Sequence, residues 1–284
     1  MNILVLGASG MLGSAVFRYF SQYNGFNVIG SVRNDIYSKK LKENKFSEVI
    51  QGIDIKNHDD LVSLFAKTKP NIVINCIGLV KQLKISNDPL SSLQINAILP
   101  HQLANICDLV GARLIHLSTD CVFSGLKGMY TEDDIPDATD LYGRSKLLGE
   151  VCYPNSITLR TSIIGHELNG SRSLINWFLS QEGAVRGFKK AVFSGLPTVE
   201  IAQIIRDYVI PNPCLHGLYH LSSEPINKYE LLSLVAEVYA KNIEIIPDES
   251  LVIDRSLDSS RFRNVTGFQP KPWSEMIMAM HEFS

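Results

Sequence analysis

The chain has 284 residues, of which 45% are hydrophobic and 20% are charged, and its formal net charge is −2. This composition excludes a disordered or fibrous protein, and the balanced charge gives no basic footprint for nucleic acid or an anionic membrane. The 5 cysteines are scattered and form no CxxC pair, which argues against a disulfide framework or a zinc site. No apolar run approaches the length of a membrane span. We therefore expect a cytoplasmic protein without a metal site, a nucleic-acid partner or a membrane partner.

The first half of the chain alternates short apolar runs with stretches of helical spacing. Strands are predicted at 2–6, 26–32, 47–52, 71–78, 112–119 and 156–162, and helices at 11–23, 58–68, 89–111 and 140–151. Such alternation predicts an α/β fold with a doubly wound, Rossmann-type parallel sheet that is buried on both faces. Pro100 lies within the helix predicted at 89–111, and it either bends this helix or marks a late start.

The second half loses this regular rhythm. Short amphipathic helices are predicted at 173–181 and 227–240, and brief strands at 191–195 and 217–222. We expect a Rossmann domain over 1–160, with segments near 197–213 returning to it. We expect a smaller α/β part over 161–284.

A glycine-rich turn follows the first predicted strand. The sequence GASGMLG places Gly7, Gly10 and Gly13 in GxxGxxG spacing between that strand and the first helix. Glycines at these positions permit a tight turn, a close approach of the backbone to a diphosphate, and close packing of helix and strand. The position in an alternating sheet favours a dinucleotide site over a plain structural turn. The candidate cofactor-binding residues of this turn are Gly7, Ser9, Gly10, Met11, Leu12 and Gly13.

The end of the second strand bears on the choice of cofactor. An acid near this point typically binds the ribose hydroxyls of NAD, whereas an arginine accommodates the 2′-phosphate of NADP. In the sequence SVRND, Ser31 and Arg33 come first, and Asp35 follows beyond the expected strand end. We therefore predict NADPH, with NADH as the disfavoured cofactor; a solvated surface charge is the alternative reading of Arg33.

Two later segments are also expected to contact the cofactor. Asp54 and Ile55 follow the third strand and are placed to border the adenine. Cys76, Ile77 and Gly78 lie at the end of the fourth strand, and Gly78 permits a close backbone approach.

Three polar residues near the middle of the chain suggest catalysis. Tyr142 and Lys146 are separated by four residues, so on a helix they share one face. A neighbouring ammonium favours the phenolate and would lower the pKa of the tyrosine to a useful value. Thr119 ends a predicted buried strand, where α/β sheets place ligands, so its hydroxyl is suited to hold a substrate carbonyl oxygen. A solvated helix pair and a turn-forming hydroxyl are the alternatives.

The motifs GASGMLG, STD and YGRSK together resemble those of the extended short-chain dehydrogenase/reductases. The run STDCVFSG…GMYTEDD…YGRSKLLGE is similar to the dTDP-4-dehydrorhamnose reductase-like family, and LRTS (159–162) and RSLDSSRF (255–262) extend the similarity. The resemblance implies that Thr119, Tyr142 and Lys146 form the catalytic triad and that Lys146 also binds the nicotinamide ribose. It also implies that residues 161–284 bind the substrate, a nucleotide-linked 4-keto-6-deoxy sugar used for surface polysaccharide.

The chain departs from this family at the expected sugar pocket. Cys121 and Ile163 stand where aromatic residues are usual, which favours a related substrate such as a UDP-linked 2-acetamido-2,6-dideoxy-4-hexulose. The expected substrate-binding residues are Lys81, Asp120, Cys121 and Arg255.

Two other functions remain open from the sequence. An epimerase or dehydratase of the same superfamily is disfavoured, because Cys121 replaces the base of the dehydratases and Arg33 favours exchangeable NADPH. A non-catalytic, cofactor-binding regulatory subunit is disfavoured by the intact Thr119, Tyr142 and Lys146. A homodimer is compatible with the sequence, which does not specify the oligomeric state.

Overall fold

The computed structural model describes residues 1–34, 41, 47–81, 84–168 and 170–284. Its first half follows the predicted alternation of strands and helices. The elements that build the main sheet and its helices are β1 (Asn2–Leu6), α1 (Met11–Phe20), β2 (Asn27–Ser31), β3 (Ser47–Ile50), α3 (His58–Thr68), β4 (Ile72–Asn75), η1 (Lys84–Asn87), α4 (Pro89–Ser92), η2 (Leu93–Ile98), α5 (Leu99–Val110), β5 (Arg113–Thr119), η3 (Asp120–Val122), α6 (Leu141–Leu148) and β6 (Ser156–Thr161).

With β11 (Gly217–His220) from the second half, these strands form one parallel sheet in the order β11-β6-β5-β4-β1-β2-β3 within the described residues. Strand β1 pairs with β2 on one side and β4 on the other. Successive strands are therefore added in one direction from β1 to β3 and in the opposite direction from β4 onward. Ligands of open α/β sheets bind at the carboxyl ends of the strands at such a reversal. The predicted Rossmann fold is therefore confirmed, and this edge is where a site is expected.

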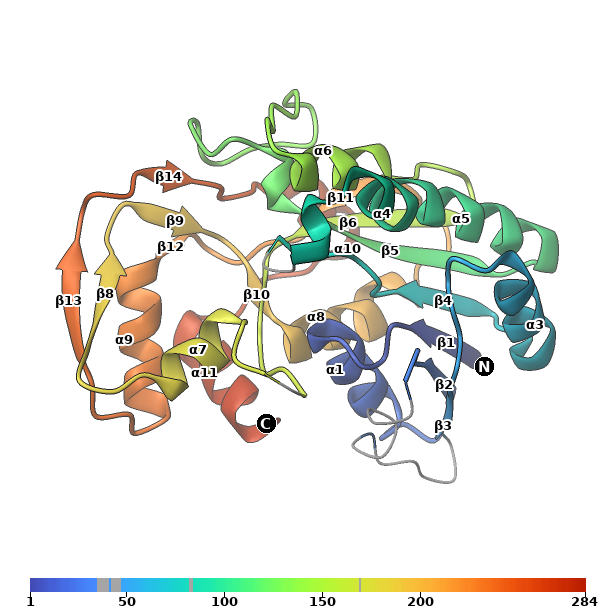
Figure 1. Ribbon diagram of the computed structural model, residues 1–284, viewed down its shortest axis with the longest axis horizontal. Coiled ribbons are helices and arrows are strands. Elements are labelled where there is room, and N and C mark those ends of the chain that lie inside the picture. Colours follow the sequence, from blue (N-terminus) through green and yellow to red (C-terminus); the bar gives the residue numbers. More distant parts are fainter. Residues whose placement is uncertain (35–40, 42–46, 82–83, 169) are drawn as a thin grey trace.

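The sheet is buried between two layers of helices (Figure 1). Neighbouring residues of β5 illustrate this, because Ile115 packs in one hydrophobic cluster and Leu114 in the other. The first cluster includes Val16 of α1, and the second includes Leu103 of α5. Figure 1 shows α4, α5 and α6 above the sheet and α1 and α8 below it. Burial on both faces explains why the strands read as continuous apolar runs.

The helix predicted at 89–111 is divided into three parts. Asp88 caps its start, a π-helical stretch occupies η2, and α5 follows with Pro100 in its first turn. Ile98, which precedes α5, is itself helical, so Pro100 lies in a continuous helix where π-helical hydrogen bonding gives way to α-helical bonding, and its missing amide falls at this change. Of the two roles considered for Pro100, the structure supports the later start of a regular helix, after the π-helical stretch.

The second half contributes to two layers. Its elements are β7 (Ile163–Ile164), α7 (Leu174–Ser180), β8 (Ala184–Phe188), β9 (Ala191–Phe193), β10 (Leu196–Pro197), α8 (Thr198–Ile204), η4 (Ile205–Val209), β11 (Gly217–His220), β12 (Ile226–Asn227), α9 (Lys228–Val238), β13 (Glu244–Asp248), β14 (Ile253–Asp254), α10 (Ser260–Thr266) and α11 (Trp273–Glu282). Strand β11 was expected in the smaller part, but it pairs with β6 in the main sheet. Its small number of apolar residues gave no indication of which sheet it would join.

The smaller part lies beside one end of the main sheet, on the left in Figure 1. It contains the parallel pair β8 and β13 and the three-stranded arrangement β12-β9-β14. Helices α7, α9 and α11 pack with these strands around a separate cluster that includes Phe178, Leu231 and Ile277.

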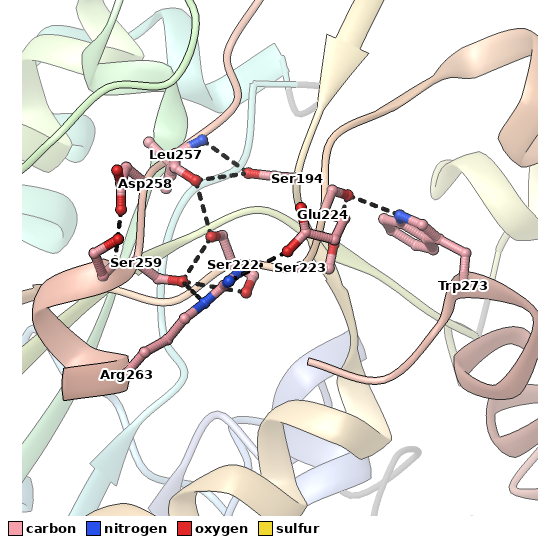
Figure 2. A network of polar contacts seen from close by, with 10 residues as sticks. Ser194, Ser222, Ser223, Glu224, Leu257, Asp258, Ser259, Arg263 and Trp273 are labelled. Atoms are coloured by element: carbon pink, nitrogen blue, oxygen red, sulfur yellow. Dashed lines mark hydrogen bonds and ion pairs between the residues drawn. The ribbon is translucent and has the colours of Figure 1, made fainter. Parts of the chain in front are cut away.

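Hydrogen bonds join the segment RSLDSSRF to both parts of the molecule, as Figure 2 shows. The Ser222 hydroxyl donates to the carbonyl of Leu257 at 2.9 Å, and the amide of Leu257 donates to the Ser194 hydroxyl at 2.8 Å. Arg263 donates to the Ser259 hydroxyl and to the carboxylate of Glu224. This network holds residues 255–262 against the strands that lead to the site.

Within the described ranges, no helix is both long and apolar enough to cross a membrane.

Candidate active site

The glycine-rich turn connects β1 to α1 at the carboxyl end of the sheet. Gly7 has a φ of 78°, which favours glycine, and a Cβ at Gly13 would collide with the carbonyl oxygen of Gly7. Gly10 caps α1 without any side-chain hydrogen bond, and the first turn of α1 contains no acidic residue. The first-turn amides therefore have neither a side-chain cap nor a nearby negative charge, an arrangement suited to an anionic group. Met11, Leu12 and Gly13 supply these amides, and Ser9 precedes them.

The predicted cofactor-selecting residues lie at the end of β2. Ser31 is the last residue of this strand and is buried, and its carbonyl accepts a hydrogen bond from Ala8 of the glycine-rich turn. Arg33 follows two residues later and is exposed. The strand end and the turn are thus adjacent, which suits a cofactor that spans both. Asp35 lies outside the described residues.

The residues expected beside the adenine follow β3. Ile55 is half-buried and packs against the second hydrophobic cluster. Asp54 is exposed, its amide donates to the carboxylate of Asp60, and its own carboxylate accepts from the amide of Lys56. Asp54 is therefore held in a turn that orders this edge of the sheet.

The loop after β4 runs alongside the glycine-rich turn. A Cβ at Gly7 would come within 2.8 Å of the side chain of Ile77, and the Cys76 amide donates to the carbonyl of Leu6. Burial raises the pKa of the Cys76 thiol to about 12, and the charge of Lys146 opposes this rise. Cys76, Ile77 and Gly78 therefore lie near both the predicted diphosphate turn and Lys146, the predicted catalytic lysine.

The predicted catalytic residues come from adjacent elements. Thr119 is the last residue of β5, and Tyr142 and Lys146 lie on α6, whose start is capped by the Asp140 side chain. The Lys146 ammonium donates to the carbonyl of Leu117 at 2.7 Å, which fixes α6 against β5. The Thr119 hydroxyl acts on the Tyr142 phenol and favours a lower pKa for it. The fold therefore brings together all three residues that the sequence singled out.

The electrostatics of this group differ from expectation. Burial raises the pKa of Tyr142, the nearby Cys121 adds to the rise, and the Thr119 hydroxyl opposes it. Burial also lowers the pKa of Lys146 to about 8, against the opposing charge of Glu150. The expected lowering of the Tyr142 pKa by Lys146 is wrong for the chain by itself, because desolvation dominates and the ammonium is bonded to Leu117.

Asp120 and Cys121 continue from Thr119 into the short helix η3. The Thr119 hydroxyl donates to the Asp120 carboxylate at 3.1 Å and accepts from the Cys121 amide at 3.2 Å. Burial raises the pKa of Asp120, and the charge of Arg255 is the largest opposing influence. Arg255 itself donates from Nε to the carbonyl of Phe123 at 2.9 Å. These three predicted substrate residues are therefore grouped around the end of β5.

Lys81, the fourth predicted substrate residue, lies farther toward the surface. Its ammonium forms an exposed ion pair with Asp140 at 2.9 Å. Since Asp140 caps the helix that carries Tyr142, Lys81 contacts the border of the site.

Asn96 is a polar residue of the site that the sequence did not indicate. It is buried in η2, its side-chain oxygen accepts from the amide of Leu79 at 2.8 Å, and its side-chain nitrogen donates to the Ser145 hydroxyl at 3.1 Å. It thus connects the loop after β4 to the helix α6. The irregular π-helical turn that aims this side chain has no signature in the local sequence.

A buried ion pair lies next to the end of β5, where Ser118 precedes Thr119. Arg160 of β6 donates twice to the carboxylate of Glu150, at 2.8 and 2.6 Å, and Ser118 donates to the same carboxylate. Arg160 also donates to Nε2 of His220, whose Nδ1 donates to the carbonyl of Tyr130 at 2.9 Å. Glu150 and Arg160 belong to the motifs YGRSKLLGE and LRTS, so the structure gives these two motifs a shared supporting role.

Lys228 also reaches the site, from the start of α9. Its charge acts on Asp120, and the charges of Asp120 and Cys121 act on it in turn. The position of a lysine at a distant helix start gave no sign of this proximity.

Comparisons with known proteins show which proteins the chain resembles. The family model described as the RmlD substrate binding domain matches residues 1–282. The methionine adenosyltransferase 2 subunit beta of Xenopus tropicalis is 26% identical over 299 residues, covering 96% of this chain and 79% of that protein. A dTDP-4-dehydrorhamnose reductase of Aggregatibacter actinomycetemcomitans is 24% identical over 314 residues, covering 100% and 99%.

The fold is also that of a solved reductase. The crystal structure of a dTDP-4-dehydrorhamnose reductase from Bacillus anthracis in complex with NADP superimposes with a TM-score of 0.77 at 18% identity, covering 100% of this chain and 99% of that one. At this identity the likeness establishes the shared fold.

Proposed function

The chain belongs to the RmlD substrate binding domain family, and from this premise we propose that it is an NADPH-dependent reductase of a nucleotide-linked 4-keto-6-deoxy sugar. The observation that carries the proposal is the grouping of Thr119, Tyr142 and Lys146 at the end of β5. This group lies on the same sheet edge as the glycine-rich turn, which suits a carbonyl reduction by a dinucleotide.

The residues at the carboxyl edge fit NADPH. The uncapped start of α1 suits the diphosphate, with Gly7 and Gly13 leaving room for close approach. Ser31 and the exposed Arg33 would hold the 2′-phosphate, and Lys146 the nicotinamide ribose. When bound, the cofactor supplies a hydride. The NADP complex of the Bacillus anthracis reductase supports the same choice of cofactor.

The chain's own residues would manage the oxygen and its proton. Thr119 would hold the substrate carbonyl oxygen, and Tyr142 would donate a proton to it as negative charge develops. A raised pKa keeps the Tyr142 phenol protonated at neutral pH, which is the state that a proton donor needs. Lys146 would position the ribose and favour the phenolate that remains.

Two residues at the expected sugar pocket bear on the identity of the substrate. Cys121 and the half-buried Ile163 provide small apolar walls, so we expect a sugar other than dTDP-4-dehydrorhamnose, such as a UDP-linked 2-acetamido-2,6-dideoxy-4-hexulose. Asp120, Arg255 and Lys81 would bind its polar groups. Residues 1–160, with segments near 197–213, would serve the cofactor, and residues 161–284 the substrate, in a cytoplasmic enzyme of surface polysaccharide synthesis.

A second candidate is a regulatory subunit that binds the cofactor without turning over a sugar. The similarity to the methionine adenosyltransferase 2 subunit beta of Xenopus tropicalis favours it. Co-purification of a larger enzyme together with failure to oxidise NADPH would support this second candidate.

A direct screen tests the reductase. NADPH oxidation is measured against a panel of 4-keto-6-deoxy sugar nucleotides that carry dTDP or UDP, with NADH in parallel. We expect turnover with at least one UDP-linked sugar and a slower rate with dTDP-4-dehydrorhamnose. No oxidation with any member of the panel would contradict the proposal.

A further inference from the structure

Lys228 is placed by the smaller part of the molecule. Asn227 caps α9 with its side chain, and Lys228 is the first residue of that helix. The short strand β12 pairs with β9, with Ile226 opposite Phe193. The Lys228 ammonium lies 3.4 Å from the centroid of the Phe193 ring. A cation above an aromatic face is attracted by the ring, so this contact fixes the direction of the side chain.

The ammonium of Lys228 has no hydrogen-bond acceptor or ion-pair partner among the described residues. The Lys228 side chain is half-buried, and burial lowers its pKa to about 8 while the charges of Asp120 and Cys121 oppose this. A partly desolvated ammonium without an acceptor is stabilised by any group that supplies one. The Phe193 ring satisfies one side of the ammonium and leaves its remaining donors for another group.

These remaining donors lie near the proposed reaction. Asp120, whose charge acts on Lys228, accepts a hydrogen bond from Thr119 at 3.1 Å. Thr119 is the residue that would hold the reacting carbonyl oxygen. Arg255 acts on the same carboxylate but is anchored to the carbonyl of Phe123. Lys228 therefore lies beside Asp120, one of the residues expected to bind the substrate.

We propose that Lys228 is a substrate-binding residue, whose ammonium donates a hydrogen bond to an oxygen substituent on the hexulose ring. The inference rests on the proposed function and adds a contact to the sugar itself. A hydroxyl oxygen and the carbonyl oxygen of an acetamido group share the required acceptor chemistry. Two other roles are tested against it: binding of the diphosphate, and simple neutralisation of Asp120.

The test compares three variants. Lys228→Met removes the charge but keeps a flexible side chain that can contact Phe193. Lys228→Arg keeps a positive charge beside Asp120. Lys189→Met is the control, because Lys189 is also a lysine near an aromatic ring, 5.6 Å from the centroid of Tyr229, but it is exposed on the smaller part. Thermal unfolding of each variant confirms that it is folded before binding is measured.

Affinity is measured by calorimetry in the presence of NADP⁺. The probes are UDP-N-acetylglucosamine and dTDP-glucose, each compared with its free nucleotide, UDP or dTDP. We expect the parent chain to bind one nucleotide sugar more tightly than the matching nucleotide. Lys228→Met should weaken the binding of that nucleotide sugar by about 10-fold to 100-fold, as expected for the loss of a hydrogen bond from a charged group. It should leave the affinity for the free nucleotide unchanged. Lys228→Arg should recover part of the loss, and Lys189→Met should bind as the parent does.

Each other outcome has a definite meaning. An equal loss for the sugar and the free nucleotide would assign Lys228 to the diphosphate and overturn the inference. A lower melting temperature of Lys228→Met with unchanged affinities would mean that Lys228 neutralises Asp120, and this would also overturn the inference. A parent chain that binds no nucleotide sugar would overturn the inference as well. Where a 4-keto sugar is turned over, Lys228→Met should raise its KM and leave the KM for NADPH unchanged. The predicted affinity pattern without any NADPH oxidation would instead reject the reductase and retain a sugar-binding Lys228.

Discussion

The residues of the site differ in how the protein environment treats their charges. Burial raises the pKa of Tyr142 and lowers that of Lys146 to about 8, so in each case desolvation favours the neutral form. Burial also raises the pKa of Asp120 and so favours its neutral form, although the charges of Arg255 and Lys228 oppose the effect. A group of buried polar residues of this kind is stabilised most by a ligand that supplies compensating hydrogen bonds.

Arg33 offers a test of cofactor choice at the residue scale. If its exposed guanidinium pairs with the 2′-phosphate, the charge-assisted hydrogen bonds contribute about 1.5–3 kcal/mol. Arg33→Ala should then weaken NADPH binding by about 10-fold to 100-fold and leave the affinity for NADH nearly unchanged. Fluorescence titration measures both affinities. Arg186→Ala, which removes an exposed arginine on β8, serves as the control. An equal loss of affinity for both cofactors would show that Arg33 does not bind the 2′-phosphate.

At the scale of elements, the apolar periodicity was sufficient to predict most of the main sheet. Strand β1 and helix α3 have the predicted bounds, because both are strongly patterned and clearly ended. The π-helical turn η2 and the pairing of β11 depend on tertiary contacts that a short segment does not encode. For the same reason, the sequence indicated Thr119 and Tyr142 from their positions on elements but could not indicate Asn96 or Lys228.

The ion pair between Glu150 and Arg160 connects the end of α6 to β6 and gives a prediction for these elements. Both side chains are buried, and removal of one charge leaves the other without its partner. Glu150→Gln should therefore lower the free energy of unfolding by about 3–5 kcal/mol. Urea denaturation measures this change.

The exposed pair of Glu48 and Lys67 provides a matched control. Glu48→Gln should change the free energy of unfolding by less than about 1 kcal/mol, since solvent screens exposed pairs. Similar effects of the two substitutions would mean that the buried pair does not support the site as described.

For the whole molecule, buried histidines predict how stability depends on pH. Burial, and next the charge of Arg160, lowers the pKa of His220 to about 4, and burial lowers that of His116 well below its usual value. The unfolded chain therefore binds protons first as the pH falls below about 6.5. The free energy of unfolding should be highest above this pH and decline toward pH 4. His220 should account for a loss on the order of 3 kcal/mol.

Urea denaturation between pH 7.5 and pH 4.5 checks this dependence. His220→Gln should flatten the decline, because glutamine can keep both hydrogen bonds without gaining a charge. His216→Gln, at an exposed position, should leave the slope unchanged. A decline that is equally steep in His220→Gln would rule out His220 as its source.

The role of Tyr142 as proton donor is tested most directly by kcat. The measurement compares kcat for NADPH oxidation, with the best 4-keto sugar nucleotide, between the parent chain and Tyr142→Phe. Positioned proton transfer typically contributes about 10²–10⁴-fold, so kcat should fall by about that factor. The affinity for NADPH should stay the same, because the phenol acts on the substrate oxygen. An unchanged kcat in Tyr142→Phe would contradict the account.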